Sequence, residues 1–94
     1  MSEALEYAAL KALAEPRRRR ILEALAAEPA PVAELARRCG CSRGLMVHHL
    51  EVLEGAGLVR IVERQARVAP DGLAALRRYF DEALTAAAIA SPRA

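Results

Sequence analysis

The chain has 94 residues, of which 54% are hydrophobic and 28% charged, with 14 basic against 12 acidic side chains. This length is enough for one modest core, so we expect a single domain over residues 1–94. The two cysteines stand one residue apart and form no disulfide framework. We find no signal-peptide pattern and no apolar run near 20 residues, which predicts a cytoplasmic protein with no membrane partner.

The first half of the chain predicts two helices separated by a short break. Ser2 can cap a first helix that runs to about Ala14. Its apolar residues recur at helical spacing on more than one side, which predicts more than one packing partner. Pro16 fits the first turn of a second helix that ends at Ala27. The sequence EPAP, residues 28–31, then breaks the chain.

Four consecutive arginines, residues 17–20, begin this second helix. Such a run is typical of a nucleic-acid-binding patch. Helical neighbours are about 100° apart, however, so the four side chains splay around the axis. We therefore expect some of them to pair locally, for example with Glu15 or Glu23, and favour this interpretation over a shared DNA contact.

Two further helices follow, joined by a tight turn. Val32 to Cys39 form a short third helix, and Gly40 is the natural left-handed residue of the turn. Ser42 is a good N-cap for a fourth helix, which runs to about Gly55 and is terminated by Gly57. Its inward side is expected to carry Met46, His49 or Leu50, and Leu53.

The second half continues with a hairpin and a last helix. Leu58 to Glu63 is the first predicted strand and Ala66 to Ala69 the second. Arg64-Gln65 between them contains neither Gly nor Asn, so the hairpin boundary stays open. Asp71 can cap the last helix, and residues 91–94 are expected to fray. An apolar seam along this helix is formed by Leu73, Leu76, Phe80, Leu84 and Ala87.

This order of elements defines a mainly α fold with a small β-hairpin, a winged helix-turn-helix with five helices and a short wing. The stretches LAEPRRRRIL (13–22), VAELARRCGCSRGLMVHHLEVLEGAGLV (32–59) and PDGLAALRRYF (70–80) resemble the ArsR/SmtB family of winged-helix transcriptional repressors. The most specific part is the pattern from Ser42 to Val59, with HHL and AGLV at the family's spacing. The resemblance also implies a structural role for Arg18.

The resemblance implies a homodimer, joined by the first and last helices, that binds double-stranded operator DNA and blocks transcription. The apolar surface of these two helices agrees, because a monomer of 94 residues would leave much of it exposed. The expected dimer interface consists of Leu5, Ala9, Ala12, Leu76, Phe80, Leu84 and Ala87.

The predicted inward side of the fourth helix leaves its other side for DNA. Arg43 is expected to recognise guanine with two hydrogen bonds, Val47 to meet a thymine methyl, and His48 to bond a base or phosphate. Phosphates are expected at the capped helix end and at nearby arginines. The family's wing is usually longer, so a contact by Arg64 stays open. The full predicted set is Arg37, Arg38, Ser42, Arg43, Gly44, Val47, His48, Arg64 and Arg67; the alternative for each is a solvated surface.

The stretch CGCSRGLMVHHL, residues 39–50, contains cysteines and histidines that are usual zinc ligands. The histidines lie about 10 Å along the helix from its start, too far to join the cysteine pair. Family metal sites use a C-x-C directly after the Glu-Leu of the third helix, or Asp and His pairs on the last helix. Neither is present here, so we expect no metal and no cofactor. His49 is expected to pack inside the fold with a local hydrogen bond.

Cys41 is expected to be a buried small hydrophobe, and Cys39 a partly exposed thiol whose pKa Arg38 lowers. A thiol-based sensor of arsenite-like ions or of oxidation is therefore one alternative. A winged-helix module that binds protein is another. No nucleophile with its base, phosphate loop or paired carboxylates is present, which argues against an enzyme. The leading hypothesis is a dimeric, sequence-specific repressor without the family's metal sites; its inducer is unknown.

Overall fold

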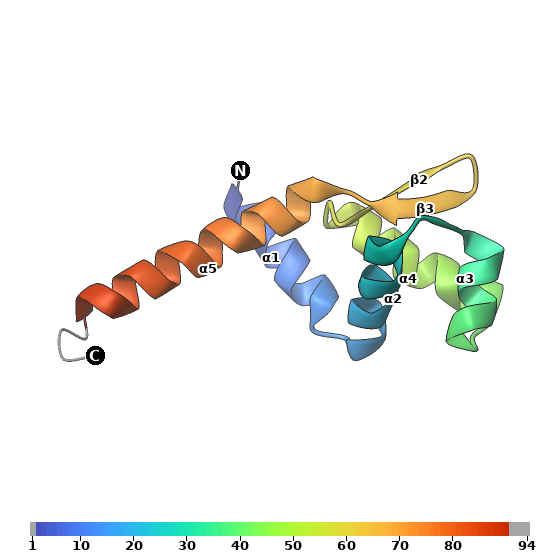
Figure 1. The fold of residues 1–94 in the computed structure, drawn as a ribbon, viewed down its shortest axis with the longest axis horizontal. Coiled ribbons are helices and arrows are strands. Elements are labelled where there is room, and N and C mark those ends of the chain that lie inside the picture. The colour runs from blue at the N-terminus through green and yellow to red at the C-terminus, as the bar shows by residue number, and fades with distance from the viewer. Residues whose placement is uncertain (1, 91–94) are drawn as a thin grey trace.

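The computed structural model describes residues 2–90, which form five helices and a three-stranded antiparallel sheet at one edge of the molecule (Figure 1). In chain order the elements are α1 (Ser2–Leu13), α2 (Pro16–Ala27), β1 (Ala30–Pro31), α3 (Val32–Cys39), α4 (Arg43–Gly55), β2 (Val59–Val62), β3 (Gln65–Val68) and α5 (Pro70–Ala90). The predicted winged helix-turn-helix is confirmed. The expected cap by the Ser2 side chain and the expected tail at 91–94 lie outside what the structure describes.

The core is built from the aliphatic side chains that the helical spacing pointed inward. The largest side chains with almost no exposed surface are Ile21, Leu35, Met46, Leu50, Leu53, Leu58 and Val59. The predicted inward side of α4 is confirmed, with His49 buried beside Leu50. Each buried aliphatic side chain of this size stabilises the fold by about 1.5–3 kcal/mol, so the register of α4 is strongly determined.

Residues 28–31, which we expected only to break the chain, contain the short edge strand β1. Ala30 lies opposite Ala66 and Pro31 opposite Gln65, so β3 is the central strand of the sheet. A proline has no N–H to donate and is tolerated only at such an edge. The prediction of a two-stranded hairpin was therefore incomplete, because a two-residue strand is too short to show an alternating pattern.

The turn of the hairpin lies one residue earlier than the sequence suggested. Glu63 and Arg64 occupy it with φ of 52° and 67°, and β2 and β3 flank it directly. Positive φ at both central residues is the geometry that matches the twist of a two-residue hairpin. Neither residue is glycine, so each costs on the order of 1 kcal/mol. The sheet pairing holds the turn despite this cost and places Arg64 at its tip.

Helix α5 begins at Pro70, one residue before the predicted cap, and Asp71 lies in its first turn. Its start packs against α1, whereas every residue from 77 to 90 is exposed. The Cα radius of gyration is 15.4 Å, against about 12 Å for a compact chain of this length. The projecting end of α5 accounts for this elongation (Figure 1). No helix within residues 2–90 is long and apolar enough to cross a membrane.

Three residues expected at the dimer interface belong to the chain's own core. Ala9, Ala12 and Leu76 are 0%, 1% and 6% exposed, so they have no surface left for a partner. The expectation fails for these three because they pack into the core cluster of their own chain. Leu5 is half-buried, while Phe80, Leu84 and Ala87 are exposed.

Candidate nucleic-acid interface

The turn between α3 and α4 is fixed by local hydrogen bonds. Gly40 adopts φ 66° and ψ 33°, and its N–H donates to the Arg37 carbonyl at 3.2 Å. The Cys41 N–H donates to the Ala36 carbonyl at 3.1 Å, which completes the usual glycine-ended helix terminus. The Leu45 N–H then donates to Ser42 Oγ at 3.0 Å. The predicted turn and cap are confirmed, and together they set the direction of α4.

Helix α4 has one buried and one exposed side. Arg43, Gly44, Val47 and His48 are all exposed, opposite the buried Met46 side. Nothing lies within 4 Å of a Cβ built on Gly44, so this part of the helix surface is open to close approach. The four residues predicted for base recognition therefore lie where a DNA groove would reach them.

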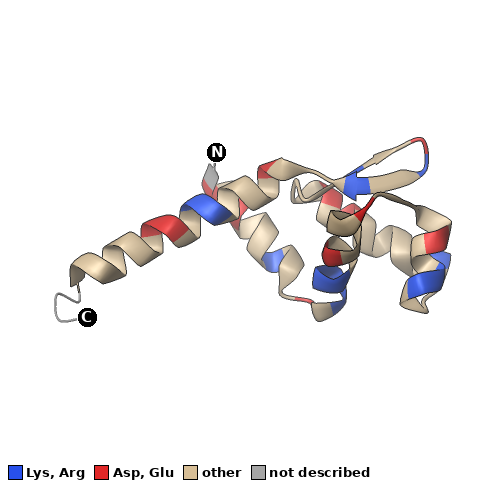
Figure 2. Ribbon diagram, in the orientation of Figure 1, with Lys and Arg blue, Asp and Glu red and all other residues tan. Residues whose placement is uncertain are grey.

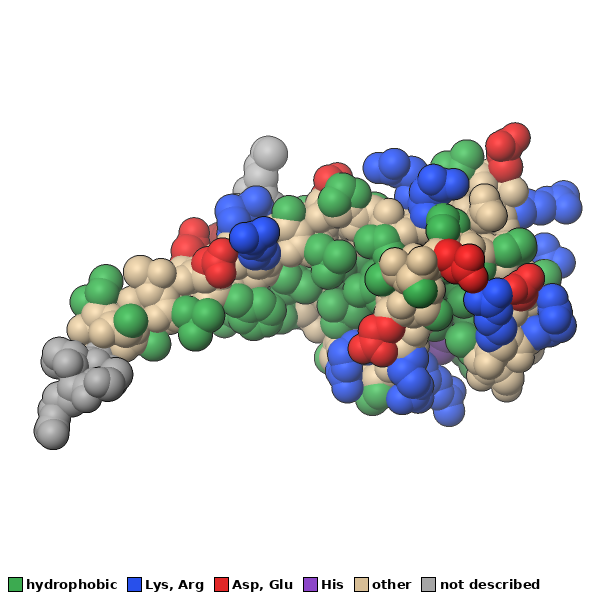
Figure 3. Space-filling view, viewed as in Figure 1, with side chains coloured by type: hydrophobic (Ala, Val, Ile, Leu, Met, Phe, Trp, Pro, Cys, Tyr) green, Lys and Arg blue, Asp and Glu red, His purple; other side chains and the backbone are tan. Residues whose placement is uncertain are grey.

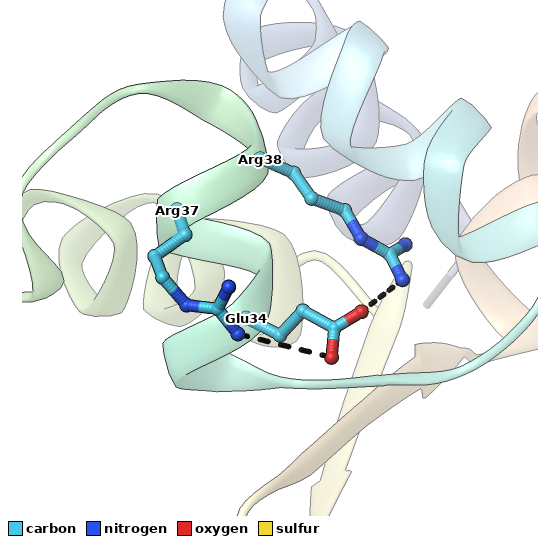
Figure 4. Close-up of polar contacts among 3 residues, drawn as sticks. All are labelled: Glu34, Arg37 and Arg38. Atoms are coloured by element: carbon cyan, nitrogen blue, oxygen red, sulfur yellow. Dashed lines mark hydrogen bonds and ion pairs between the residues drawn. The ribbon is translucent and has the colours of Figure 1, made fainter.

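The two arginines predicted for phosphate contact share a carboxylate with each other. Arg38 donates from Nη2 to Glu34, and Arg37 Nη2 lies 4.0 Å from Glu34 Oε1 (Figure 4). Side chains of both arginines remain well exposed. Surface ion pairs of this kind contribute at most about 1 kcal/mol, so phosphates can compete with Glu34 for either guanidinium.

The sheet contains an arginine pair that was not predicted from the sequence. Arg60 in β2 lies directly opposite Arg67 in β3, and both are exposed. Residues opposite each other point to the same side of a sheet, so two like charges face one another and destabilise the hairpin slightly. The alternation of Val59, Arg60 and Ile61 was the available signal for Arg60. Figure 2 shows basic residues at the base of the hairpin and at its tip.

Two of the four arginines at residues 17–20 form hydrogen bonds with the end of α1. Arg18 Nε donates to the Ala12 carbonyl at 2.7 Å, and Arg19 Nη1 donates to the Leu13 carbonyl at 2.6 Å. These carbonyls end α1 and lack partners within their own helix. The expected local pairing is therefore found, but with backbone carbonyls of α1 and not with the side chains of Glu15 or Glu23. The structural role expected for Arg18 is confirmed.

The Glu15 carboxylate caps α2 instead. Its Oε1 accepts a hydrogen bond from the Arg17 backbone N–H at 2.8 Å. That hydrogen bond, more than the nearby arginine charges, lowers the pKa of Glu15. The start of α2 is therefore held by a carboxylate and a proline together.

His49 is the one buried polar side chain among the described residues, at 5% exposure. Desolvation, with a smaller effect of Arg18, lowers its pKa and keeps the ring neutral. Arg18 Nη1 lies 3.5 Å from Nδ1. Because a guanidinium only donates, Nδ1 accepts and the ring hydrogen stays on Nε2. The expected packing histidine with a local hydrogen bond is confirmed.

Both cysteines are free thiols, Cys39 exposed and Cys41 half-buried against the core. Cys41 packs against the core as expected, but it is only half-buried because it lies at the edge of the turn. Desolvation, followed by the neighbouring Cys41, raises the pKa of Cys39 and outweighs Arg20 and Arg38. Arg38 lowers this pKa as expected, but its effect is too small to decide the direction of the shift. In the described chain no three His, Cys, Asp or Glu side chains gather where they would hold a metal ion.

A capped helix with an exposed outer side, followed by an arginine-bearing hairpin, is the arrangement of winged helix-turn-helix DNA-binding proteins. Residues 13–62, more than half of the chain, match a family model described as a helix-turn-helix domain. Together with the relatives below, this match shows that the chain belongs to the ArsR family of winged helix-turn-helix transcriptional regulators, which are not enzymes.

The relatives agree in sequence and in structure. The HTH-type transcriptional regulator Rv2034 of Mycobacterium tuberculosis is 44% identical over 85 residues, covering 82% of this chain and 79% of that protein. The crystal structure of the ArsR family regulator RHA00566 superposes with a TM-score of 0.80 at 26% identity, covering 86% and 93% of the two chains. A homodimeric winged helix-turn-helix DNA-binding domain, Mb0332 of Mycobacterium bovis, gives 0.68 at 26% identity, covering 96% and 85%.

Proposed function

We propose that residues 1–94 form a single domain that acts in the cytoplasm as a homodimeric repressor on double-stranded operator DNA, without the family's metal sites. The observation that supports it best is α4, capped by Ser42, with its outer side free of core contacts. On this side Arg43 recognises guanine and Val47 contacts a thymine methyl. His48 bonds a base or a phosphate, and the open surface over Gly44 lets the backbone approach the groove.

Phosphate contacts hold the domain in register on the duplex. Arg37 and Arg38 exchange Glu34 for the DNA backbone beside the Ser42 cap. In the hairpin, Arg60 and Arg67 face each other, and a phosphate between them removes their mutual repulsion. Arg64 at the tip reaches the flanking groove. Figure 3 shows basic side chains concentrated on the body formed by α2, α3 and the sheet.

The projecting half of α5 supports the dimer. Tyr79, Phe80, Leu84 and Ile89 are 40%, 50%, 69% and 76% exposed on a segment whose residues are all exposed. An isolated helix of this length is only marginally stable in water. A second copy packed along Phe80, Leu84 and Ala87 buries this apolar surface. The Mb0332 domain, whose fold this chain shares, is a homodimer.

Two arginines separate base recognition from phosphate contact. We expect Arg43→Ala to reduce the preference for the operator over a duplex with an altered guanine by about 1–3 kcal/mol, or about 5- to 150-fold. Arg37→Ala should instead weaken all duplexes about equally and reduce the salt slope by about 1. Fluorescence anisotropy at several salt concentrations measures both, with an operator selected from genomic DNA around the protein's gene. If neither variant alters binding to any duplex, the repressor hypothesis fails and the hypothesis of a protein-binding module takes its place.

Replacing Arg60 with an uncharged residue tests whether the hairpin contacts DNA. We expect Arg60→Gln to weaken operator binding and to lower the salt slope by about 1, because one phosphate contact is lost. Its free energy of unfolding should stay the same or rise by a few tenths of a kcal/mol, since the repulsion with Arg67 disappears. Arg78→Gln on α5 is the matched control and should leave the slope unchanged. Equal slopes for the two variants would remove the hairpin from the interface.

A further inference from the structure

A cavity of about 550 Å³ lies between α2, the turn after α3 and the first residues of α4. This volume is within the range of sites that hold small organic molecules. The cavity is not part of the proposed base-recognition surface. Its wall combines three arginines with an apolar part formed by Ala24 and Leu45, behind which the buried Ile21 and Met46 lie.

The arginine run explains the charge of this wall. Arg18 and Arg19 turn to the end of α1, as their hydrogen bonds show. Arg17 and Arg20 are three residues apart, so they share the other side of α2 and line the cavity. In the described part of the chain no carboxylate pairs with either guanidinium, whereas Arg38 on the opposite wall is paired with Glu34. The cavity thus contains two guanidiniums without an ion-pair partner among the described residues, and a third, Arg38, that can exchange Glu34 for a ligand.

His49 gives an independent indication of a ligand that accepts a hydrogen bond. His49 is one of the residues that line the cavity, and only 5% of its surface is exposed. Its Nε2 has no hydrogen-bond partner in the described structure. Arg18 occupies Nδ1, so the unpartnered nitrogen is a donor. A buried donor without an acceptor is unfavourable. Nε2 itself has less than 1 Å² of exposed surface, so a ligand oxygen reaches it only when the side chains around the cavity move apart.

We infer that this cavity binds a small carboxylate with an apolar body. The guanidiniums of Arg17 and Arg20 hold the carboxylate, and His49 Nε2 donates to it. The apolar part lies against Ala24 and Leu45. An inorganic anion would satisfy the charges but leave the apolar wall unfilled, and an uncharged lipid would leave the guanidiniums unpaired.

The position of the cavity links its ligand to DNA binding, a consequence that rests on the proposed function. Arg38, Gly40 and Leu45 belong both to the cavity wall and to the helix-turn-helix. A bound carboxylate competes with DNA phosphates for Arg38 and holds the turn in one arrangement. Occupancy should therefore weaken operator binding.

Titration of the full chain without DNA tests the binding site. We expect octanoate and benzoate to bind saturably in calorimetry and to shift the His49 imidazole signals in ¹⁵N spectra. Inorganic phosphate and 1-octanol should bind at least tenfold more weakly. The double variant Arg17→Gln/Arg20→Gln should lose at least tenfold in affinity for the carboxylates. Arg64→Gln/Arg67→Gln removes the same charge far from the cavity and should bind them like the unchanged protein.

Failure of both carboxylates to saturate overturns the inference, as does equal affinity of the two double variants. Octanol binding as tightly as octanoate also overturns it. A second measurement adds octanoate to the operator complex, where we expect the Kd to rise about fivefold or more. An unchanged Kd removes the regulatory consequence. A protein that binds carboxylates but no operator would instead contradict the proposed function alone.

Discussion

Leu84→Glu is expected to make the protein monomeric and to weaken operator binding by about 10²- to 10⁴-fold. Leu84 is 69% exposed and contributes nothing to the core of its own chain. In the proposed dimer it lies in the apolar seam, where an unpaired carboxylate is costly to bury. Two linked recognition helices bind two half-sites, and a monomer loses the gain in effective concentration that linkage provides. Sedimentation equilibrium measures the mass, and anisotropy measures the affinity.

The matched control places the same charge on another side of the helix. Arg78→Glu lies on α5, away from the Phe80–Leu84 seam, and should leave the mass unchanged. The Leu84→Glu monomer should keep its near-native circular dichroism, apart from the end of α5, because the core residues of the chain are untouched. A Leu84→Glu protein that remains a dimer would contradict the interface, and we would then look to Tyr7 and Leu10 on α1, which are also exposed.

Gly72→Ala is expected to lower the free energy of unfolding by about 3 kcal/mol. A Cβ at this position would lie 2.4 Å from the Ala56 carbonyl oxygen and 3.0 Å from that of Gly57, and neither backbone atom can move aside easily. The Gly72 N–H also donates to the Gly57 carbonyl at 2.8 Å, so a shift of α5 breaks the contact that joins it to the end of α4. For a domain of this size the midpoint of thermal unfolding should fall by more than 10 °C.

Gly55→Ala provides the comparison, since nothing lies within 4 Å of the point that its Cβ would occupy at the end of α4. We expect it to be neutral or to stabilise by up to about 1 kcal/mol, because alanine favours the helix. Urea unfolding of the two variants side by side measures the difference. Equal stabilities would show that α5 can move away from Ala56 at little cost. The close packing at Gly72 would then not contribute to the free energy of unfolding.

The helix-turn-helix could be predicted almost to the residue. Val32–Cys39, the left-handed Gly40 and the Ser42 cap all appear in the structure as expected. Each depends on interactions between residues no more than about four apart, and such signals are complete within a short stretch of sequence. The exposed side of α4 follows from the same helical periodicity. The ArsR-type pattern from Ser42 to Val59 likewise lies within one continuous segment.

Tertiary structure alone decided which distant segments meet. The pairing of Ala30 with Ala66 joins segments far apart in the chain, and the position of Arg60 opposite Arg67 depends on the register of the hairpin. Helical spacing separated the arginine run, but only the position of α1 showed that Arg18 and Arg19 bind its terminal carbonyls.

Tertiary structure also decided which side chains are buried and where the cavity lies. Ala9 and Leu76 are inside because α5 packs on α1, whereas the spacing of their helices fitted a partner equally well. The unpartnered Nε2 of His49 and the charges around it result from three elements converging on one volume. The sequence by itself therefore determined the helices, their caps and their outer sides, because these arise from neighbouring residues. The packing of separate elements decided the interface left for a partner and the site left for a ligand, because both depend on contacts through space.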